Sequence, residues 1–152
     1  MTEIDIISQL QEEPDWLENY RIFVQAVLEH ENLTDREISL TLCHDEYIKE
    51  LNATYRDKDE ATDVLSFCQN EGDEIMSFPG QQLSAGDIVI SMDTLERHSE
   101  LYSVALEEEL KRVTIHGILH LKGMTHETRE PDEEMLQYQE TILAGTADLK
   151  VF

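Results

Sequence analysis

Strand-like and helix-like segments alternate along this chain, and the alternation limits the folds open to it. Short apolar or alternating runs predict strands at residues 3–8, 37–43, 62–68 and 87–91. Stripes at three- and four-residue spacing predict helices at about 15–28, 45–55, 92–100, 104–122 and 131–144. Residues 70–85, which contain Gly72, Pro79 and Gly80, predict a loop. The pattern favours an α/β (α+β) fold: a single domain over residues 1–152, with a small mixed four-stranded sheet packed by about five helices.

Local signals predict where some of these elements begin and which faces they bury. Asp15 and Asp45 are the expected N-caps of the first two helices. The acidic run at 107–109, near the start of the long helix, is expected to be solvated. Apolar residues at helical spacing predict the buried face of the first helix, and they are Leu17, Tyr20, Phe23, Val24, Val27 and Leu28.

Charge restricts the partners that this chain can bind. Its 152 residues include 11 Lys and Arg against 34 Asp and Glu, so the formal net charge is −23. Such a surface should repel nucleic acid over most of its area. A bound dication and a few arginines could still dominate a cleft within a Debye length of ~8 Å. Taken alone, composition therefore argues against an RNA or DNA partner, except through such a local cleft.

The sequence also indicates where the protein works. No run of about 18 apolar residues is present, so no membrane span is expected. The acidic N-terminus lacks the basic and apolar layout of a secretory signal. Cys43 and Cys68 lie in separate apolar runs without a CxxC partner, which predicts buried thiols in a reducing compartment. Together these features favour a cytoplasmic protein.

Three of the six histidines lie within residues 116–126. In a helix, His116 and His120 would project from one face, ~6 Å apart along the axis. Gly123 could end the helix and let His126 turn back toward them. Imidazoles bind zinc and other divalent transition metals, and three protein ligands leave one position open, as in catalytic sites. The alternative is a helix whose histidines are neighbours without a shared ion.

The best-known zinc-hydrolase helix has the pattern His-Glu-x-x-His, in which the glutamate is the general base. Gly117 follows the first histidine here, so that base is missing. Glu127 and Glu130 could reach the site, although both are expected to be solvated surface residues. The substitution at position 117 argues against a metalloprotease.

Four blocks in order carry a family resemblance. They are Leu51-Asn-x-x-Tyr-Arg56, Thr62-Asp-Val-Leu-Ser-Phe67, Gly86-Asp-Ile-Val-Ile-Ser91 and His116-Gly-x-Leu-His-Leu-x-Gly-x-x-His126. With these blocks the chain resembles the YbeY family of bacterial metal-dependent endoribonucleases. The match covers about residues 51–126. Each block alone is weak, whereas all four in order are specific.

The resemblance implies a function and a set of site residues. The metal ligands would be His116, His120 and His126, with Zn²⁺ the usual ion, and Arg56 would be important for activity. The substrate would be single-stranded RNA in the maturation of ribosomal (16S) RNA and in ribosome quality control. The partners would be the small ribosomal subunit and its assembly factors. The chain departs from the family at Met124 and Thr125, where an aromatic residue and aspartate commonly precede the last histidine, so a carboxylate that orients His126 could be missing.

Arg56 suits this chemistry on physical grounds as well. Hydrolysis of a phosphodiester builds negative charge on the phosphoryl oxygens, and a planar guanidinium can pair with two of them. The alternative for Arg56 is an exposed turn residue paired with its neighbours. Other basic residues that could form a phosphate track are Lys58, Lys111, Arg112 and Lys122. Residues expected to be structural are Thr62, Asp63 and Asp87 at turns or strand ends, and His30, His44 and His98.

Three functions remain open from the sequence. The first is metal-dependent cleavage of single-stranded ribosomal RNA. The second is a non-catalytic ribosome assembly factor in which zinc stabilises the C-terminal helices. The third is hydrolysis of a peptide or small amide, against which Gly117 argues.

Overall fold

The computed structural model describes residues 3–33, 37–68, 84–121 and 134–152. Its elements are β1 (Glu3–Ser8), α1 (Leu17–His30), β2 (Glu37–Cys43), α2 (Asp45–Arg56), β3 (Val64–Cys68), β4 (Ser84–Ser91), α3 (Met92–Tyr102), α4 (Leu106–Leu121) and α5 (Glu134–Gly145). The predicted alternation is confirmed. Ser84 and Ala85, predicted as loop, belong to β4. The rest of the predicted loop lies outside the described residues.

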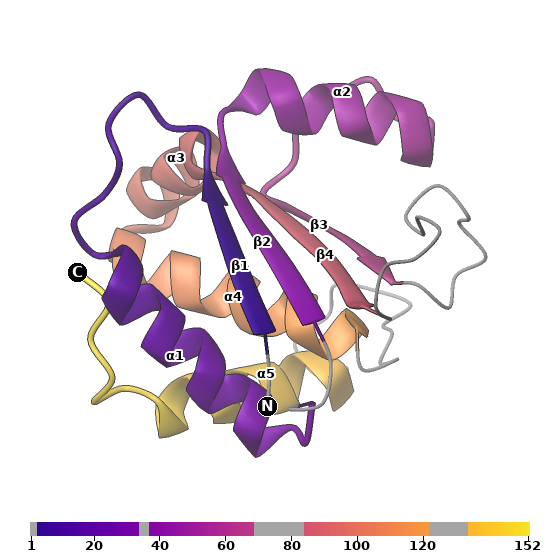
Figure 1. Ribbon diagram of the computed structural model, residues 1–152. Coiled ribbons are helices and arrows are strands. Elements are labelled where there is room, and N and C mark those ends of the chain that lie inside the picture. The colour runs from indigo at the N-terminus through magenta and orange to yellow at the C-terminus, as the bar shows by residue number, and fades with distance from the viewer. Residues whose placement is uncertain (1–2, 34–36, 69–83, 122–133) are drawn as a thin grey trace.

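The strands form one mixed sheet in the order β1-β2-β4-β3. β1 pairs with β2 and β2 with β4 in parallel, whereas β3 runs antiparallel to β4. The predicted α/β class with a four-stranded mixed sheet is confirmed. Helix α2 lies on one face of the sheet, and α1, α4 and α5 lie on the other (Figure 1). β3 is therefore an edge strand with helices above and below it.

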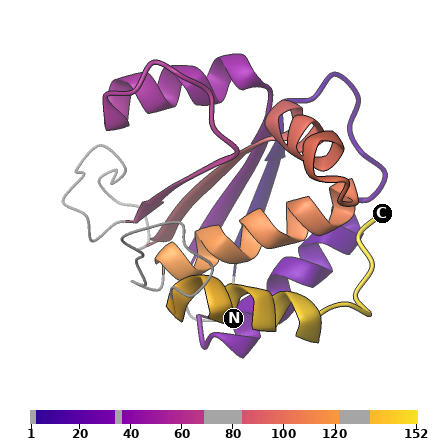
Figure 2. The same ribbon diagram turned by 180° about the vertical axis from the view of Figure 1, so that it is seen from behind.

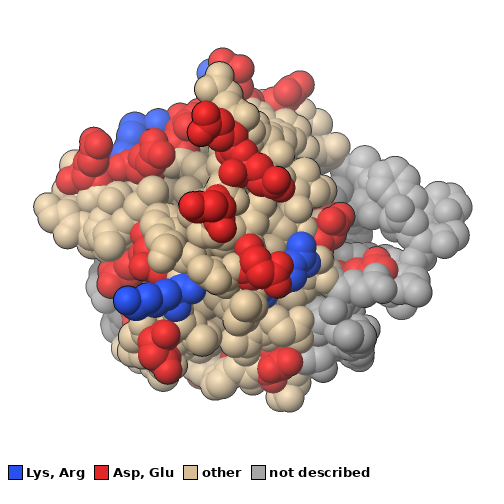
Figure 3. Space-filling view, turned by 60° about the vertical axis from the view of Figure 1, so that its left-hand side comes forward, with Lys and Arg blue, Asp and Glu red and all other residues tan. Residues whose placement is uncertain are grey.

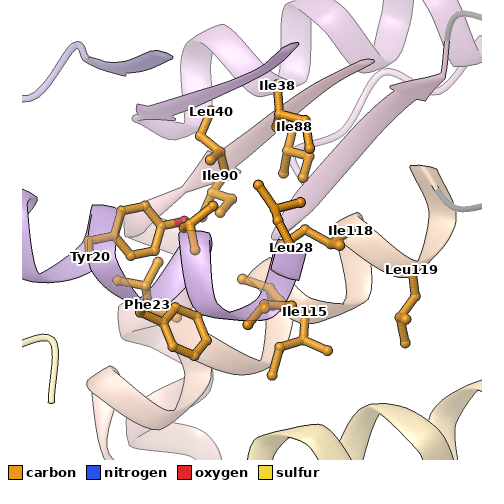
Figure 4. Close-up of a cluster of buried hydrophobic side chains, with 14 of the residues drawn as sticks. Tyr20, Phe23, Leu28, Ile38, Leu40, Ile88, Ile90, Ile115, Ile118 and Leu119 are labelled. Carbon is orange, nitrogen blue, oxygen red and sulfur yellow. The ribbon is translucent and has the colours of Figure 1, made fainter. Parts of the chain in front are cut away.

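The larger core cluster lies between the sheet and the helices α1 and α4 (Figure 4). Alternate residues of β2 and β4 face it, including Leu40, Ile88 and Ile90, as the period of a strand requires. Five of the six residues predicted for the buried face of α1 are buried, and the sixth, Leu17, is packed against the cluster. Burying an aliphatic or aromatic side chain of this size contributes about 1.5–3 kcal/mol, so this layer anchors α4 to the sheet.

A smaller cluster fixes α2 on the opposite face. Ile48 of α2 packs with Cys43, Phe67 and Val89, and Tyr55 meets the Phe67 ring edge-on with 5.6 Å between the ring centroids. The prediction of a buried thiol is confirmed for Cys43, where burial raises the pKa to about 12. The side chain of Cys68 lies outside the described part of the chain. This packing brings the end of α2 over β3.

The two predicted N-caps are wrong, for different reasons. Trp16 is the N-cap of α1 and no side chain caps that helix, so Asp15 lies one residue too early. Asp45 is the first residue of α2 rather than its cap. Its Oδ1 accepts hydrogen bonds from Ser91 Oγ and Thr94 Oγ1, each at 2.7 Å, and its other oxygen pairs with Arg97. Asp45 therefore joins the start of α2 to the start of α3.

Ionisation of Asp45 maintains this junction. Burial opposes the charge, but the hydrogen bonds from Arg97, Thr94 and Ser91 outweigh it and lower the pKa to about 2. Because this value lies below the ordinary 3.8, the carboxylate stabilises the folded chain above about pH 4 and loses that effect as the pH falls toward 2. The position of α2 is thus fixed at its start by charge and along its length by apolar packing.

Gly86 is a position where only glycine fits. Its φ is 150°, and a Cβ there would overlap the Phe67 carbonyl oxygen and the Leu121 side chain. We expect Gly86→Ala to lower the free energy of unfolding by about 2–4 kcal/mol, because backbone strain and overpacking both act. Urea denaturation followed by circular dichroism measures this change.

Gly145 at the end of α5 provides the matched control. A Cβ at Gly145 would meet no atom within 4 Å, so Gly145→Ala is expected to change stability by less than ~1 kcal/mol. Equal stability of the two alanine variants would contradict the close contact inferred at Gly86.

Candidate functional site

His116 and His120 project from the same face of α4, as their spacing predicts. Their ring centroids are 4.6 Å apart, and the two Nε2 atoms are 3.1 Å apart. Two imidazoles bound to one tetrahedral zinc at ~2.0–2.1 Å would place their nitrogens ~3.3 Å apart. The separation of this pair therefore fits a shared metal ion.

The third predicted ligand, His126, lies outside the described residues, as do Gly123, Met124, Thr125, Glu127 and Glu130. Within the part of the chain that is described, no group of three His, Cys, Asp or Glu side chains could hold a metal. The structure thus brings together two of the three predicted ligands, and the third stays a prediction.

His116 has a partner on α5. Its Nδ1 lies 2.6 Å from Oε1 of Gln139, a residue whose exposed fraction is only 6%. The amide nitrogen of Gln139 donates to Glu140 at 3.2 Å, and Arg112 of α4 donates to the same carboxylate from Nε at 2.9 Å. A chain of polar contacts thus runs from His116 across the α4–α5 interface.

Arg56 lies on the opposite side of the sheet edge. It is the last residue of α2, and its Nη2 donates to the Ser66 carbonyl of β3 at 2.8 Å. Its guanidinium carbon is 5.0 Å from the centroid of the Phe67 ring, within the range of a cation–π contact. Asn52, one turn earlier, donates to the carbonyl of Glu60 at 2.9 Å and so holds the turn that follows the helix. These two contacts join Arg56 to β3.

Arg56 and the two histidines line one pocket, which has a volume of about 760 Å³. Its lining residues come from β3, from the end of α2 and the turn after it, and from α4 and α5. In Figure 2, β3 lies between α2 on one side and α4 on the other. The polar side chains that line the pocket include those of Arg56, Lys58, Arg112, His116, His120 and Gln139. The predicted site residues that the structure describes therefore share one concave surface, although the sequence separates Arg56 from His116 by β3, β4, α3 and the first part of α4.

The pocket wall is less acidic than the chain as a whole. Its charged residues are Arg56, Lys58, Arg112, Glu60, Asp63 and Glu109. Basic and acidic side chains are thus balanced at the wall, whereas the chain carries 11 basic residues against 34 acidic ones. An anionic substrate is therefore repelled less by this wall than the net charge of the whole chain suggests.

Two sequence predictions about charged residues of α4 need correction. Glu109 is not solvated: it is buried, and one of its oxygens lies 2.6 Å from Nη1 of Arg112. Lys111 does not belong to a phosphate track. It is buried, and its Nζ donates to the Thr146 and Leu149 carbonyls after α5, because those carbonyls lie within reach across the α4–α5 contact.

Arg112 and Lys58 do line the pocket, whereas Lys122 lies outside the described residues. Arg112 contacts three carboxylates, those of Glu108, Glu109 and Glu140. The hydrogen bond with Glu140 is the main reason that the pKa of Arg112 is raised. Arg112 is therefore a permanent charge in the wall of the pocket.

Gly117 lies where α4 approaches β4 closely. An added Cβ would lie 3.0 Å from Cγ2 of Ile88, so a larger residue at this position requires the Ile88 side chain to shift. The absence of a glutamate at position 117 thus goes with a tight contact between α4 and the sheet.

Most of the residues predicted as structural have structural contacts. His30 contacts Glu31 at 2.6 Å, and His44 contacts Asp93 at 2.9 Å. Asp63 Oδ1 accepts from the amide of Val64 at 2.8 Å at the start of β3. Asp63 also lines the pocket, which the sequence did not predict.

Gln139 is a site residue that was not predicted from the sequence. It lies between Met135 and Ile142 at helical spacing, and all three are buried. A polar residue inside an otherwise apolar stripe is a usable signal, because a buried amide requires a hydrogen-bond partner. Phe67 was predicted only as sheet core, and it also supports Arg56.

No helix in the described ranges is both long and apolar enough to cross a membrane.

Comparison with known proteins identifies the family. The family model described as "Endoribonuclease YbeY" matches residues 5–147. The chain belongs to the YbeY family. The resemblance inferred from the four blocks is thereby confirmed, and the match extends well beyond them.

Relatives of similar length support this assignment. The chain is 42% identical to "Endoribonuclease YbeY" of Treponema denticola over 149 residues, which cover 96% of this chain and 95% of that protein. It is 46% identical to the protein of the same name from Borrelia recurrentis over 131 residues, 86% of each. The solution structure of TM1509 from Thermotoga maritima is similar with a TM-score of 0.64 and 29% identity, and the match covers 92% of this chain and 86% of that one.

Proposed function

We propose that this protein is a metal-dependent endoribonuclease that cuts single-stranded ribosomal RNA. The observation that carries the proposal is the pocket along β3, which holds the two histidines and Arg56 together. Family membership supports the reaction class, because the relatives are named endoribonucleases.

Each residue has a separate task in this proposal. His116, His120 and His126 would hold the ion, which we expect to be Zn²⁺, although other divalent transition metals accept the same ligands. Lewis-acid chemistry at such a site lowers the pKa of water to ~7 and so provides a nucleophile at neutral pH. Arg56 donates hydrogen bonds to the phosphoryl oxygens, on which charge accumulates as the phosphodiester is attacked.

The acidic surface determines how RNA approaches. Carboxylates are spread over the face seen in Figure 3, and basic groups there are few. Such a surface repels the phosphate backbone, so we expect the contact with RNA to be confined to the neighbourhood of the pocket. We propose that the small ribosomal subunit and its assembly factors supply the remaining affinity in the cytoplasm, during maturation of 16S ribosomal RNA and ribosome quality control.

Metal depletion tests the proposal directly. We expect chelated and dialysed protein to lose cleavage of a single-stranded RNA oligonucleotide and to regain it when stoichiometric Zn²⁺ is restored. A duplex of the same sequence is the matched substrate control, and it should be cut far more slowly. Gel analysis of end-labelled RNA measures both rates, and elemental analysis measures the metal content.

The same experiment separates the non-catalytic alternative. If metal-loaded protein binds small ribosomal subunits but never cleaves RNA, the protein is an assembly factor and the nuclease proposal is wrong. Cleavage of a peptide library in place of RNA would favour an amide hydrolase instead.

A further inference from the structure

The contact between α4 and α5 determines which nitrogen of His116 carries a proton. A neutral imidazole has one N–H and one lone pair, and only the nitrogen with the lone pair can bind a metal. If the ring nitrogen that faces Gln139 carries the proton, the lone pair lies on the other nitrogen, and that other nitrogen can bind a metal. The 2.6 Å contact between His116 Nδ1 and Gln139 Oε1 is the relevant observation.

The orientation of the Gln139 amide follows from its neighbours. Arg112 donates from Nε to one oxygen of Glu140 at 2.9 Å and from Nη2 to the other at 3.2 Å. This pairing keeps Glu140 ionised, since the hydrogen bond from Arg112 outweighs burial and lowers the carboxyl pKa. An ionised carboxylate only accepts hydrogen bonds, so the amide atom 3.2 Å from Glu140 must be the NH₂ group.

The carbonyl oxygen of Gln139 then faces His116. A carbonyl oxygen only accepts, so Nδ1 of His116 must be the donor and must carry the proton. The lone pair of His116 is consequently on Nε2, the atom that lies 3.1 Å from Nε2 of His120. Reversal of the amide would bring two acceptors together at Glu140, so the contact with Glu140 excludes it.

We infer that Gln139 is a positioning residue that holds His116 as the Nδ1–H tautomer, with Nε2 directed toward the metal position, and that Arg112 sets the Gln139 amide through Glu140. The inference rests on the proposed metal site. Burial of Gln139 supports it, because a side chain with an exposed fraction of 6% cannot exchange this partner for bulk water. Outer hydrogen-bond partners of metal-binding histidines fix both tautomer and ring orientation in the same way.

Gln139→Leu tests the inference, with Gln137→Leu as the matched control on the exposed side of α5. Leucine keeps the size of the side chain and removes the acceptor. We expect the dissociation constant for Zn²⁺, measured at one fixed pH by competition with a chelator, to rise about 10–100-fold in Gln139→Leu. Gln137→Leu should bind Zn²⁺ as the unchanged protein does.

A second readout does not depend on the metal. In the metal-free protein, nitrogen-15 spectra of the histidine rings should show the proton of His116 on Nδ1, and in Gln139→Leu the two tautomers should mix. A purely structural role for Gln139 would lower the melting temperature without moving this signal. A proton on Nε2 of His116 in the unchanged protein, or full Zn²⁺ affinity in Gln139→Leu, overturns the inference. If the unchanged protein binds no metal, the proposed function fails, and the tautomer measurement still decides the role of Gln139.

Discussion

Replacing His116 by alanine is expected to abolish metal binding and RNA cleavage together while the fold persists. The imidazole contributes one of the two nitrogens that lie 3.1 Å apart, so its loss removes one of the proposed ligands. The penalty should exceed the ~10–100-fold that follows loss of an outer hydrogen-bond partner of a ligand. The fold should survive because His116 lines the pocket and is not part of the buried apolar clusters.

Three measurements check this expectation on one preparation. Elemental analysis gives the metal content, end-labelled RNA gives the cleavage rate, and a thermal melt reports the fold. His44→Ala is the matched control, because His44 is half exposed and contacts Asp93, and neither residue lines the pocket. That control should keep both metal and activity. A folded His116→Ala variant that cuts RNA at the unchanged rate would remove the basis of the proposed mechanism.

The sequence predicted the sheet and the helix faces because those features repeat locally. Apolar residues from Leu17 to Leu28 recur at the spacing of a helix, and polar and apolar residues alternate over residues 37–43 with the period of a strand. Each pattern specifies its element without reference to the rest of the chain. The pairing order β1-β2-β4-β3 has no such local signal, because it depends on how helices cover both faces of the sheet.

Polar contacts between distant residues account for the errors. Asp45 looked like a helix cap, but Ser91 and Thr94, which bond to it, lie 46 and 49 residues further on. Lys111 looked like part of a phosphate track, but its Nζ donates to the carbonyls of Thr146 and Leu149, which lie 35 and 38 residues further on. Local propensity describes an isolated segment, and these residues take their roles from a second segment.

The site residues divide in the same way, into those that local spacing predicts and those that depend on packing between distant segments. The spacing of His116 and His120 fixes their common face within one helix, so the sequence alone predicted it. Gln139 joins that site only because α5 packs on α4, and Arg56 joins it only because the end of α2 packs on β3. Without the family resemblance, nothing in the sequence would have linked Arg56 to the histidines.

Arg56→Lys is expected to lower kcat by about 10²–10³-fold while the metal content stays unchanged. Loss of one positioned donor at a developing oxyanion has this magnitude in comparable sites. Lysine keeps the positive charge, but it cannot pair with two oxygens at once, nor lie flat on the Phe67 ring with a donor to the Ser66 carbonyl. If the interaction is made only in the transition state, kcat and kcat/KM fall together.

Arg21→Lys is the control for this change, since Arg21 lies on α1 and contacts the Ile4 carbonyl outside the pocket. Steady-state rates on the single-stranded RNA oligonucleotide separate kcat from KM, and Arg56→Glu extends the series by reversing the charge. A rise in KM alone in Arg56→Lys would mean that Arg56 only binds RNA, and an unchanged rate would leave the guanidinium without a catalytic role. Loss of metal from Arg56→Lys would show instead that the two sides of the pocket depend on each other. The metal content and the rate together therefore decide whether Arg56 acts on the substrate or on the metal site.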